Sequence, residues 1–146
     1  MKIEIDIDEK FTDLGVRITA SDLTPDIERI ISILRMMDMQ IPVRWDDETI
    51  LLDVDKILYI EAVERNTFIY TKDNTYESAL KLYEFEQQLP EKDFIRISKQ
   101  SILNLRKVKS LKTDINRKIR VTLLNGEQIV VSRMYAENLR KRLGIK

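Results

Sequence analysis

The stretch FIRISKQSILNLRKVKSLKTDINRKIRVTLLNGEQIVVS, residues 94–132, decides the fold. It contains five short apolar-rich runs with polar connections between them, a pattern typical of β-strands. These runs are FIRI, SILNL, VKSLKT, KIRVTLL and EQIVVS. Asn125-Gly126 separates the last two, and Asn-Gly between alternating runs is a strong hairpin signal. The stretch therefore predicts short antiparallel strands joined by tight turns.

The preceding residues extend this pattern from Pro42 onward. Five further strand-like runs are VRW, TILL, KILYIEA, TFIYT and YESAL, and the composition of KDNT, residues 72–75, predicts a hairpin turn. A short helix is predicted over residues 80–90, where Leu82, Phe85 and Leu89 share a face and Pro90 ends the helix. A second helix is predicted over 132–143, with Gly144 just past its end. We therefore expect an α+β domain that is mostly β.

Residues 1–41 predict a small acidic ββα extension to a main domain at 42–146. KIEIDID and VRITA alternate like two half-buried strands. Thr24 is a predicted cap for a helix that begins at Pro25. Its expected apolar face consists of Ile27, Ile30, Ile31, Leu34 and Met37. Such an extension has little core of its own, so we expect it to pack on the rest of the chain or on a second copy.

The composition excludes several classes of chemistry. The chain has no cysteine, which removes disulfides, thiolate nucleophiles and Cys-based zinc sites, and no histidine, which removes the commonest general base. Only three glycines are present, and they are too dispersed for a phosphate-binding loop. Asp46, Asp47 and Glu48 are better explained as an acidic turn than as a metal site. We expect no enzyme activity, cofactor, metal or small-molecule substrate.

The hydropathy of the chain indicates where the protein acts. No segment approaches the roughly 20 consecutive apolar residues that span a bilayer. The N-terminal MKIEIDIDEK lacks the apolar core of a signal peptide. We therefore expect a cytoplasmic protein.

The charge of the chain is divided unevenly. Residues 1–64 carry seven basic and 16 acidic side chains, a net charge of −9, whereas residues 65–146 carry 18 and nine, a net charge of +9. Residues 96–120 alone hold nine cations and one acid, Asp114. A row of cations can follow DNA phosphates, but lysines also protect exposed edge strands. A protein-interaction module with oppositely charged halves therefore stays open as the alternative. The hypothesis that the stretch binds RNA is weakened by its few aromatic residues, because single-stranded nucleic acid stacks on such side chains.

Three blocks of the sequence resemble the LytTR family of bacterial DNA-binding domains. They are ILYIEA, FIRISKQSILNLRKVKSL and NGEQIVVSRMYAENLRKRL, in the order and spacing of the family pattern, and the match runs from about residue 50 to 146. The resemblance implies short antiparallel sheets whose loops enter successive major grooves of duplex DNA. It implies a transcriptional regulator rather than an enzyme.

The resemblance implies which residues of this chain contact DNA bases. They fall on Arg65, Asn66 and Thr67 after IEA, on Gln100 in SKQS and on Arg133 in VSRMY. Arg133 suits bidentate contact with guanine, and the Gln100 amide could read an adenine edge.

The predicted contacts to the DNA backbone come from the same stretch. They are Ser98, Lys99, Arg106 and Lys107, with Arg65 as a further phosphate contact. Asn104 matches the family asparagine and is interpreted as structural, by capping a turn or bonding to the backbone.

This sequence departs from the family pattern at two sites. Ser98 stands where many members have histidine, and Gln100 where serine or asparagine is usual, so a different DNA sequence is expected. Residues 1–42 are too few for the phosphorylation-receiver domain of many members, so the chain resembles the short, receiver-free type. That type suggests a small multi-pass membrane protein as a partner, and the helix at 25–38 suggests a homodimer.

Overall fold

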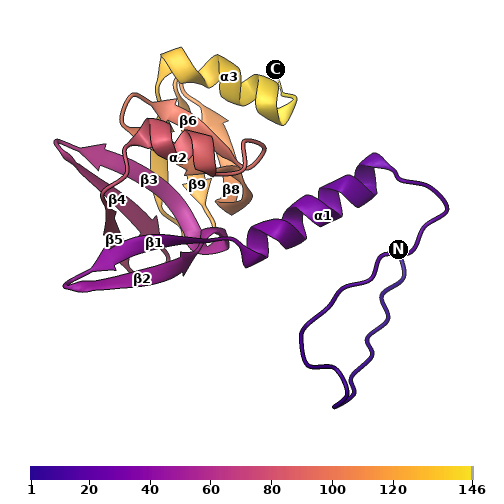
Figure 1. Cartoon of the computed structure of the whole chain (residues 1–146). Coiled ribbons are helices and arrows are strands. Elements are labelled where there is room, and N and C mark those ends of the chain that lie inside the picture. The colour runs from indigo at the N-terminus through magenta and orange to yellow at the C-terminus, as the bar shows by residue number, and fades with distance from the viewer. Residues whose placement is uncertain (146) are drawn as a thin grey trace. The chain divides into compact units, whose positions relative to one another are not determined.

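The structure is a computed structural model that describes residues 1–145, apart from the side chain of Met36. The chain divides into two compact units, residues 1–33 and 34–146, and the division falls inside helix α1, Pro25–Asp38. Figure 1 shows the order of the elements along the chain. The larger unit contains all ten strands of the described residues.

The N-terminal unit corrects one prediction. Residues 1–23, all of which are described, contain no helix or strand, so the two strands predicted there are not observed. Ile3, Ile5 and Ile7 are exposed. Alternation produces a strand only where a partner strand and an apolar surface are available, and a sequence pattern supplies neither.

The predicted helix is confirmed as α1. The amide of Ile27 donates to the side-chain oxygen of Thr24 at 3.4 Å, as expected of a cap. Its apolar residues 27, 30, 31 and 34 are only half-buried and Met37 is 56% exposed, so the expected face is not fully covered in the single chain.

Seven strands form one antiparallel sheet in the order β2-β1-β5-β4-β3-β7-β6. Each of the seven predicted runs between residues 43 and 105 overlaps one of them. Their bounds are β1 Gln40–Trp45, β2 Glu48–Asp53, β3 Ile57–Val63, β4 Asn66–Thr71, β5 Thr75–Ser78, β6 Phe94–Ser98 and β7 Ser101–Asn104. A 3₁₀ turn, η1 Val54–Lys56, leads into β3, and helix α2, Leu82–Gln88, joins β5 to β6.

Three strands form a second antiparallel sheet in the order β10-β9-β8. The strands are β8 Val108–Thr113, β9 Ile119–Leu123 and β10 Gln128–Val131, and a 3₁₀ turn, η2 Leu105–Lys107, precedes them. The predicted Asn-Gly hairpin joins β9 to β10, with Gly126 at φ +89°, a conformation that glycine adopts without strain. Helix α3, Arg133–Leu143, follows and ends at Gly144, whose φ is +69°.

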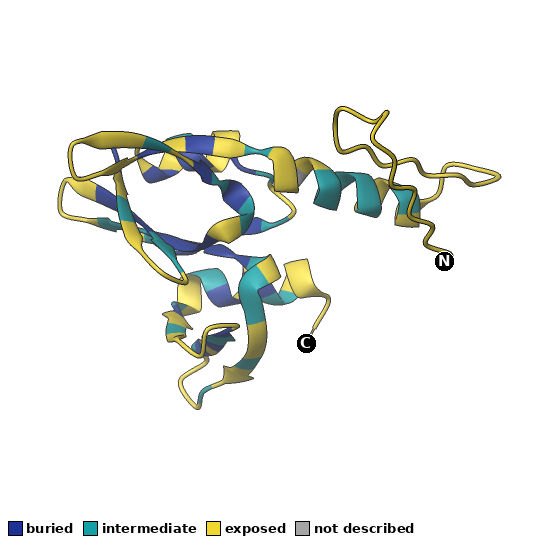
Figure 2. Cartoon of the chain, turned by 90° about the horizontal axis from the view of Figure 1, so that it is seen from below, coloured by how far each residue is buried: buried dark blue, intermediate teal, exposed yellow. Residues whose placement is uncertain are grey.

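Two hydrophobic cores hold the larger unit together. One contains residues from the seven-stranded sheet and α2, including Ile60, Ile102 and Phe85. The other joins that sheet to the small sheet and α3, and includes Leu103 and Leu139. Adjacent residues of β7 thus enter different cores, which is why this strand is apolar at successive positions. Figure 2 shows the buried residues along the strands and the exposed ones at the turns.

Asn104, the last residue of β7, connects the start of β3 to η2. Its side chain is fully buried, donates to the carbonyl oxygen of Ile57 at 2.8 Å and accepts from the amide of Arg106 at 3.0 Å. A buried amide must have such partners, because an unpaired polar group in a core is costly. The structural role predicted for Asn104 is confirmed.

Candidate nucleic-acid interface

The first candidate segment is the tight turn between β3 and β4. Val63 pairs with Asn66, so Glu64 and Arg65 form the turn, and Glu64 has a φ of +58°. Arg65 and Asn66 are exposed. Thr67 is only 5% exposed, because it pairs with Ala62 inside the sheet. The structure therefore does not present Thr67 at the surface, contrary to its prediction as a base contact.

The second segment is the turn between β6 and β7. Ser98 pairs with Ser101, which leaves Lys99 and Gln100 exposed at the tip. The hydroxyl oxygen of Ser98 accepts from the amide of Gln100 at 3.1 Å. This bond fixes the turn and leaves the hydroxyl hydrogen of Ser98 available for donation.

The third segment is the start of α3. Ser132 is the residue before the helix, and Arg133 and Met134 are exposed in its first turn. Arg133 thus projects from a rigid element, whose Ala136 and Leu139 are buried in the second core.

Two main-chain hydrogen bonds bring these segments together. The amide of Ala62, at the end of β3, donates to the carbonyl of Gln100 at 2.7 Å. The amide of Ser132 donates to the carbonyl of Ile97, at the end of β6, at 3.0 Å. Segments separated by more than 30 residues therefore meet at one end of the large sheet. We call residues 64–66, 98–101 and 132–134 the loop face.

Arg106 and Lys107 do not join the loop face. They lie in η2, after the end of β7, whereas Gln100 precedes its start. The two ends of β7 are about 10 Å apart at the usual rise per residue. Arg106 instead lies near Asp93, whose pKa is raised by burial and partly lowered again by Arg106. Lys107 lines a hollow of about 620 Å³ together with residues such as Lys56 and Leu124.

The β8–β9 turn was not predicted as a site from the sequence, although strand pairing places it near the start of α3. Thr113 pairs with Ile119, and Ile119 pairs with Val131, which directly precedes Ser132. The β8–β9 turn, residues 114–118, therefore lies at the end of the small sheet from which α3 begins. Arg117 is exposed in this turn at a φ of +67°. The cation run marked the segment, but only strand pairing indicates which end it occupies.

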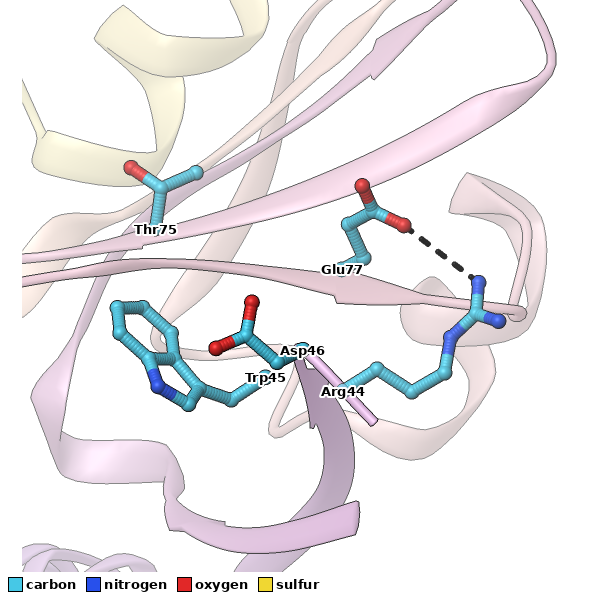
Figure 3. A pocket seen from close by; sticks show the side chains of 5 residues that line it. All are labelled: Arg44, Trp45, Asp46, Thr75 and Glu77. Carbon is cyan, nitrogen blue, oxygen red and sulfur yellow. Dashed lines mark ion pairs between the residues drawn. The ribbon is translucent and has the colours of Figure 1, made fainter. Parts of the chain in front are cut away.

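Two hollows lie elsewhere in the larger unit. One, of about 280 Å³, is lined by Arg44, Trp45, Asp46, Thr75 and Glu77 (Figure 3). The other, of about 620 Å³, lies between β2, the β4–β5 turn and the β9–β10 turn. Asp46 and Asp47 form the β1–β2 turn, whereas Glu48, predicted in the same acidic turn, is the first residue of β2. The residues that the structure describes, 1–145, include no group of three or more acidic side chains that could hold a metal ion.

The helices of the described residues include none that is long and apolar enough to cross a membrane. The electrostatic character of the loop face comes from Arg65, Lys99 and Arg133, with Glu64 as an opposing charge. These exposed cations and the Gln100 amide can donate hydrogen bonds to phosphates and base edges.

Comparison with known proteins gives consistent results. A Staphylococcus aureus (strain MSSA476) protein described as an uncharacterized HTH-type transcriptional regulator is 29% identical over 147 residues, which is 99% of each chain. A protein of the same description from strain NCTC 8325 is 28% identical over the same length. The solved LytTr DNA-binding domain of a Bacillus cereus protein superposes with a TM-score of 0.69 at 30% identity, covering 73% of this chain and 97% of that one.

The fold itself differs from the helix-turn-helix that the names of the relatives suggest. Within residues 1–145, a strand or several strands separate each α-helix from the next. A helix-turn-helix requires two helices joined by a short turn.

The family model of the LytTr DNA-binding domain matches residues 47–144, two thirds of the chain. This match contains the whole loop face and both cores apart from Ile41, Val43 and Met39. Given the matching fold, the chain belongs to the LytTr DNA-binding domain family.

Proposed function

We propose that this protein is a sequence-specific transcriptional regulator whose loop face enters successive major grooves of duplex DNA. The observation that carries the proposal is the convergence of three loop segments through the Ala62–Gln100 and Ser132–Ile97 hydrogen bonds. Membership of a DNA-binding family supports the ligand class. The positions of exposed cations and amides at the loop tips support the choice of surface.

The residues of the loop face have distinct proposed roles. Arg65, Asn66, Gln100 and Arg133 contact base edges, because they are exposed at turn tips or in the first turn of a helix. Lys99 and the hydroxyl of Ser98 contact phosphates and set the register of the protein on the duplex.

Three predicted contacts have less support. The side chain of Thr67 is buried in the sheet, so we leave it out of the proposed interface. Arg106 and Lys107 lie beyond the far end of β7 and could reach phosphates only outside the segment contacted by the loop face. Their contribution to DNA binding is therefore tested separately, by Arg106→Ala and Lys107→Ala.

Selection of genomic fragments with purified protein tests the proposal. Affinity for the selected duplex and for a scrambled duplex is then measured across a salt series. We expect one repeated motif and a preference of roughly a thousandfold or more over scrambled DNA. Binding without a preferred motif that fades as salt rises would contradict the proposal and favour an interaction module for oppositely charged partners.

We also propose that α1 mediates homodimerisation. Its apolar residues repeat at helical spacing and are incompletely covered in the single chain. A symmetric dimer would match a repeated DNA motif. Sedimentation of the protein and of an Ile30→Glu, Leu34→Glu variant tests this, and a monomeric wild type at micromolar concentration would contradict it.

The last proposed partner is a small multi-pass membrane protein, which the likeness to short family members suggests. The test compares how much of the chain co-purifies with membranes from cells that express such a membrane protein and from cells that lack it. Equal recovery from both would remove this partner.

A further inference from the structure

Arg96 connects α2 to the tip of the β6–β7 turn. Its Nη1 atom lies 2.8 Å from Oε1 of Glu86, and its Nη2 atom donates to the carbonyl oxygen of Lys99 at 3.2 Å. The side chain is 24% exposed, and its Nε atom is buried with no acceptor among the described residues. Arg96 is therefore held in place although it belongs to the cationic stretch.

Both ends of this connection are fixed by packing. In β6, the neighbours Ile95 and Ile97 are buried in the second core, so Arg96 points to the opposite face of the sheet. On α2, Phe85 is fully buried beside Glu86 and anchors the helix in the first core. The carbonyl that Arg96 binds lies between two proposed DNA contacts, since Lys99 precedes Gln100 directly.

We propose that Arg96, held by Glu86, is a positioning residue that fixes the 99–100 turn in the conformation that reads DNA. This inference rests on the proposed function, because it concerns how the loop face is held. The planar guanidinium is suited to the role because it can donate to a carboxylate and a carbonyl at once. A turn held before binding loses less conformational freedom on the duplex, which favours affinity and discrimination.

The alternative is that Arg96 binds a phosphate directly. Each Nη atom already donates one hydrogen bond, and only 24% of the side chain is exposed, so few of its donors are left for a phosphate. The two roles predict opposite effects for Glu86→Ala. If Arg96 binds a phosphate, loss of Glu86 frees the arginine and removes a nearby acid, so binding to every duplex becomes stronger. If Arg96 positions the turn, loss of Glu86 loosens the turn and weakens discrimination between duplexes.

The experiment compares four variants in the full-length protein. Arg96→Ala removes both bonds, and Glu86→Ala removes the anchor. The exchanged pair Glu86→Arg, Arg96→Glu restores the ion pair but places no donor near the Lys99 carbonyl. Glu77→Ala is the matched control, because it removes the exposed Arg44–Glu77 pair of 3.6 Å at another site (Figure 3).

Three quantities are measured for each variant. They are the melting temperature, the ¹H–¹⁵N heteronuclear NOE of the Lys99 and Gln100 amides without DNA, and the ratio of affinities for the selected and scrambled duplexes. For Arg96→Ala we expect lower NOE values and a ratio reduced about tenfold, the order of one lost base contact. The exchanged pair should recover melting temperature but neither the NOE nor the ratio, and Glu77→Ala should leave both unchanged.

Three outcomes overturn the inference. One is unchanged NOE values in Arg96→Ala, and another is stronger binding of Glu86→Ala to every duplex at an unchanged ratio. The third is full recovery of the ratio by the exchanged pair, which would mean that the ion pair acts through the stability of α2. If Arg96→Ala does not fold, Glu86→Ala and the exchanged pair provide the same readouts. If the wild type prefers no duplex, the proposed function fails while the NOE still reports on the turn.

Discussion

The main-chain amide of Ala62 donates a hydrogen bond of 2.7 Å to the carbonyl of Gln100. This bond extends the pairing of β3 with β7 beyond Glu61 and Ser101, the last residues in register. The β3–β4 and β6–β7 turns are thereby held side by side. Their relative position depends on backbone geometry, so side chains at the turn tips can vary without moving the turns.

Arg133→Ala should weaken binding to the selected duplex by about 1–3 kcal/mol and relax the preference at one base position. The reason is that an arginine in the first turn of α3 can make a bidentate contact with guanine. Competition titration against single-base variants of the duplex measures the effect. Arg44→Ala, at an exposed ion pair, is the control. Equal losses on selected and scrambled DNA would remove Arg133 from the base contacts.

Lys99→Ala should weaken binding to all duplexes by similar factors and reduce the slope of log K against log salt by about 1. Lys99 is exposed at a turn tip, where a phosphate contact would displace counterions. The salt slope is measured on the selected and the scrambled duplex. An unchanged slope with altered base preference would reassign Lys99 to base reading.

Arg106→Ala and Lys107→Ala should affect binding less than Lys99→Ala, because both residues lie beyond the far end of β7. Each variant is compared with Lys99→Ala in the same salt series. A salt-slope change as large as that of Lys99→Ala would restore the predicted role of these residues as backbone contacts.

Asn104→Ala should lower the free energy of unfolding by about 1–3 kcal/mol or more, because it leaves the buried Ile57 carbonyl without its donor and η2 without its cap. Asn104→Asp retains the acceptor for the Arg106 amide but lacks the donor, so it separates the two bonds. Urea unfolding measures both. A loss below the error of the method would contradict the structural role.

Tyr59→Phe should cost about 0.5–1.5 kcal/mol at neutral pH, because Tyr59 donates to Glu127 at 2.9 Å. Burial, together with that carboxylate, raises the pKa of Tyr59 in the folded state. The stability from this group is therefore complete below the ordinary tyrosine pKa and is lost as the pH rises above it. Urea unfolding between pH 8 and 11 should show a smaller alkaline loss in Tyr59→Phe than in wild type. Tyr83→Phe, at an exposed site, is the control.

Much of the fold was predictable from local patterns. Each of the ten strand-like runs from residue 43 onward overlaps a strand, and the Asn125-Gly126 hairpin and the α3 end at Gly144 are where turn chemistry predicted them. Alternation and turn residues act over a few positions, so a sequence reveals them directly. The alternation in residues 2–8 was misleading because a strand needs a partner strand, and the local sequence does not supply one.

The sequence by itself determined the strands of the larger unit, the turns, the helices and the family. Tertiary structure alone decided which of the candidate residues share a surface. Arg96 and Lys99 belong to one cationic stretch, yet Arg96 is held against Glu86 while Lys99 is exposed. Thr67 is buried one residue after exposed Asn66. The physical reason is that strand register and long-range hydrogen bonds fix which face and which end of a sheet each side chain occupies, and neither is encoded in the spacing of nearby residues.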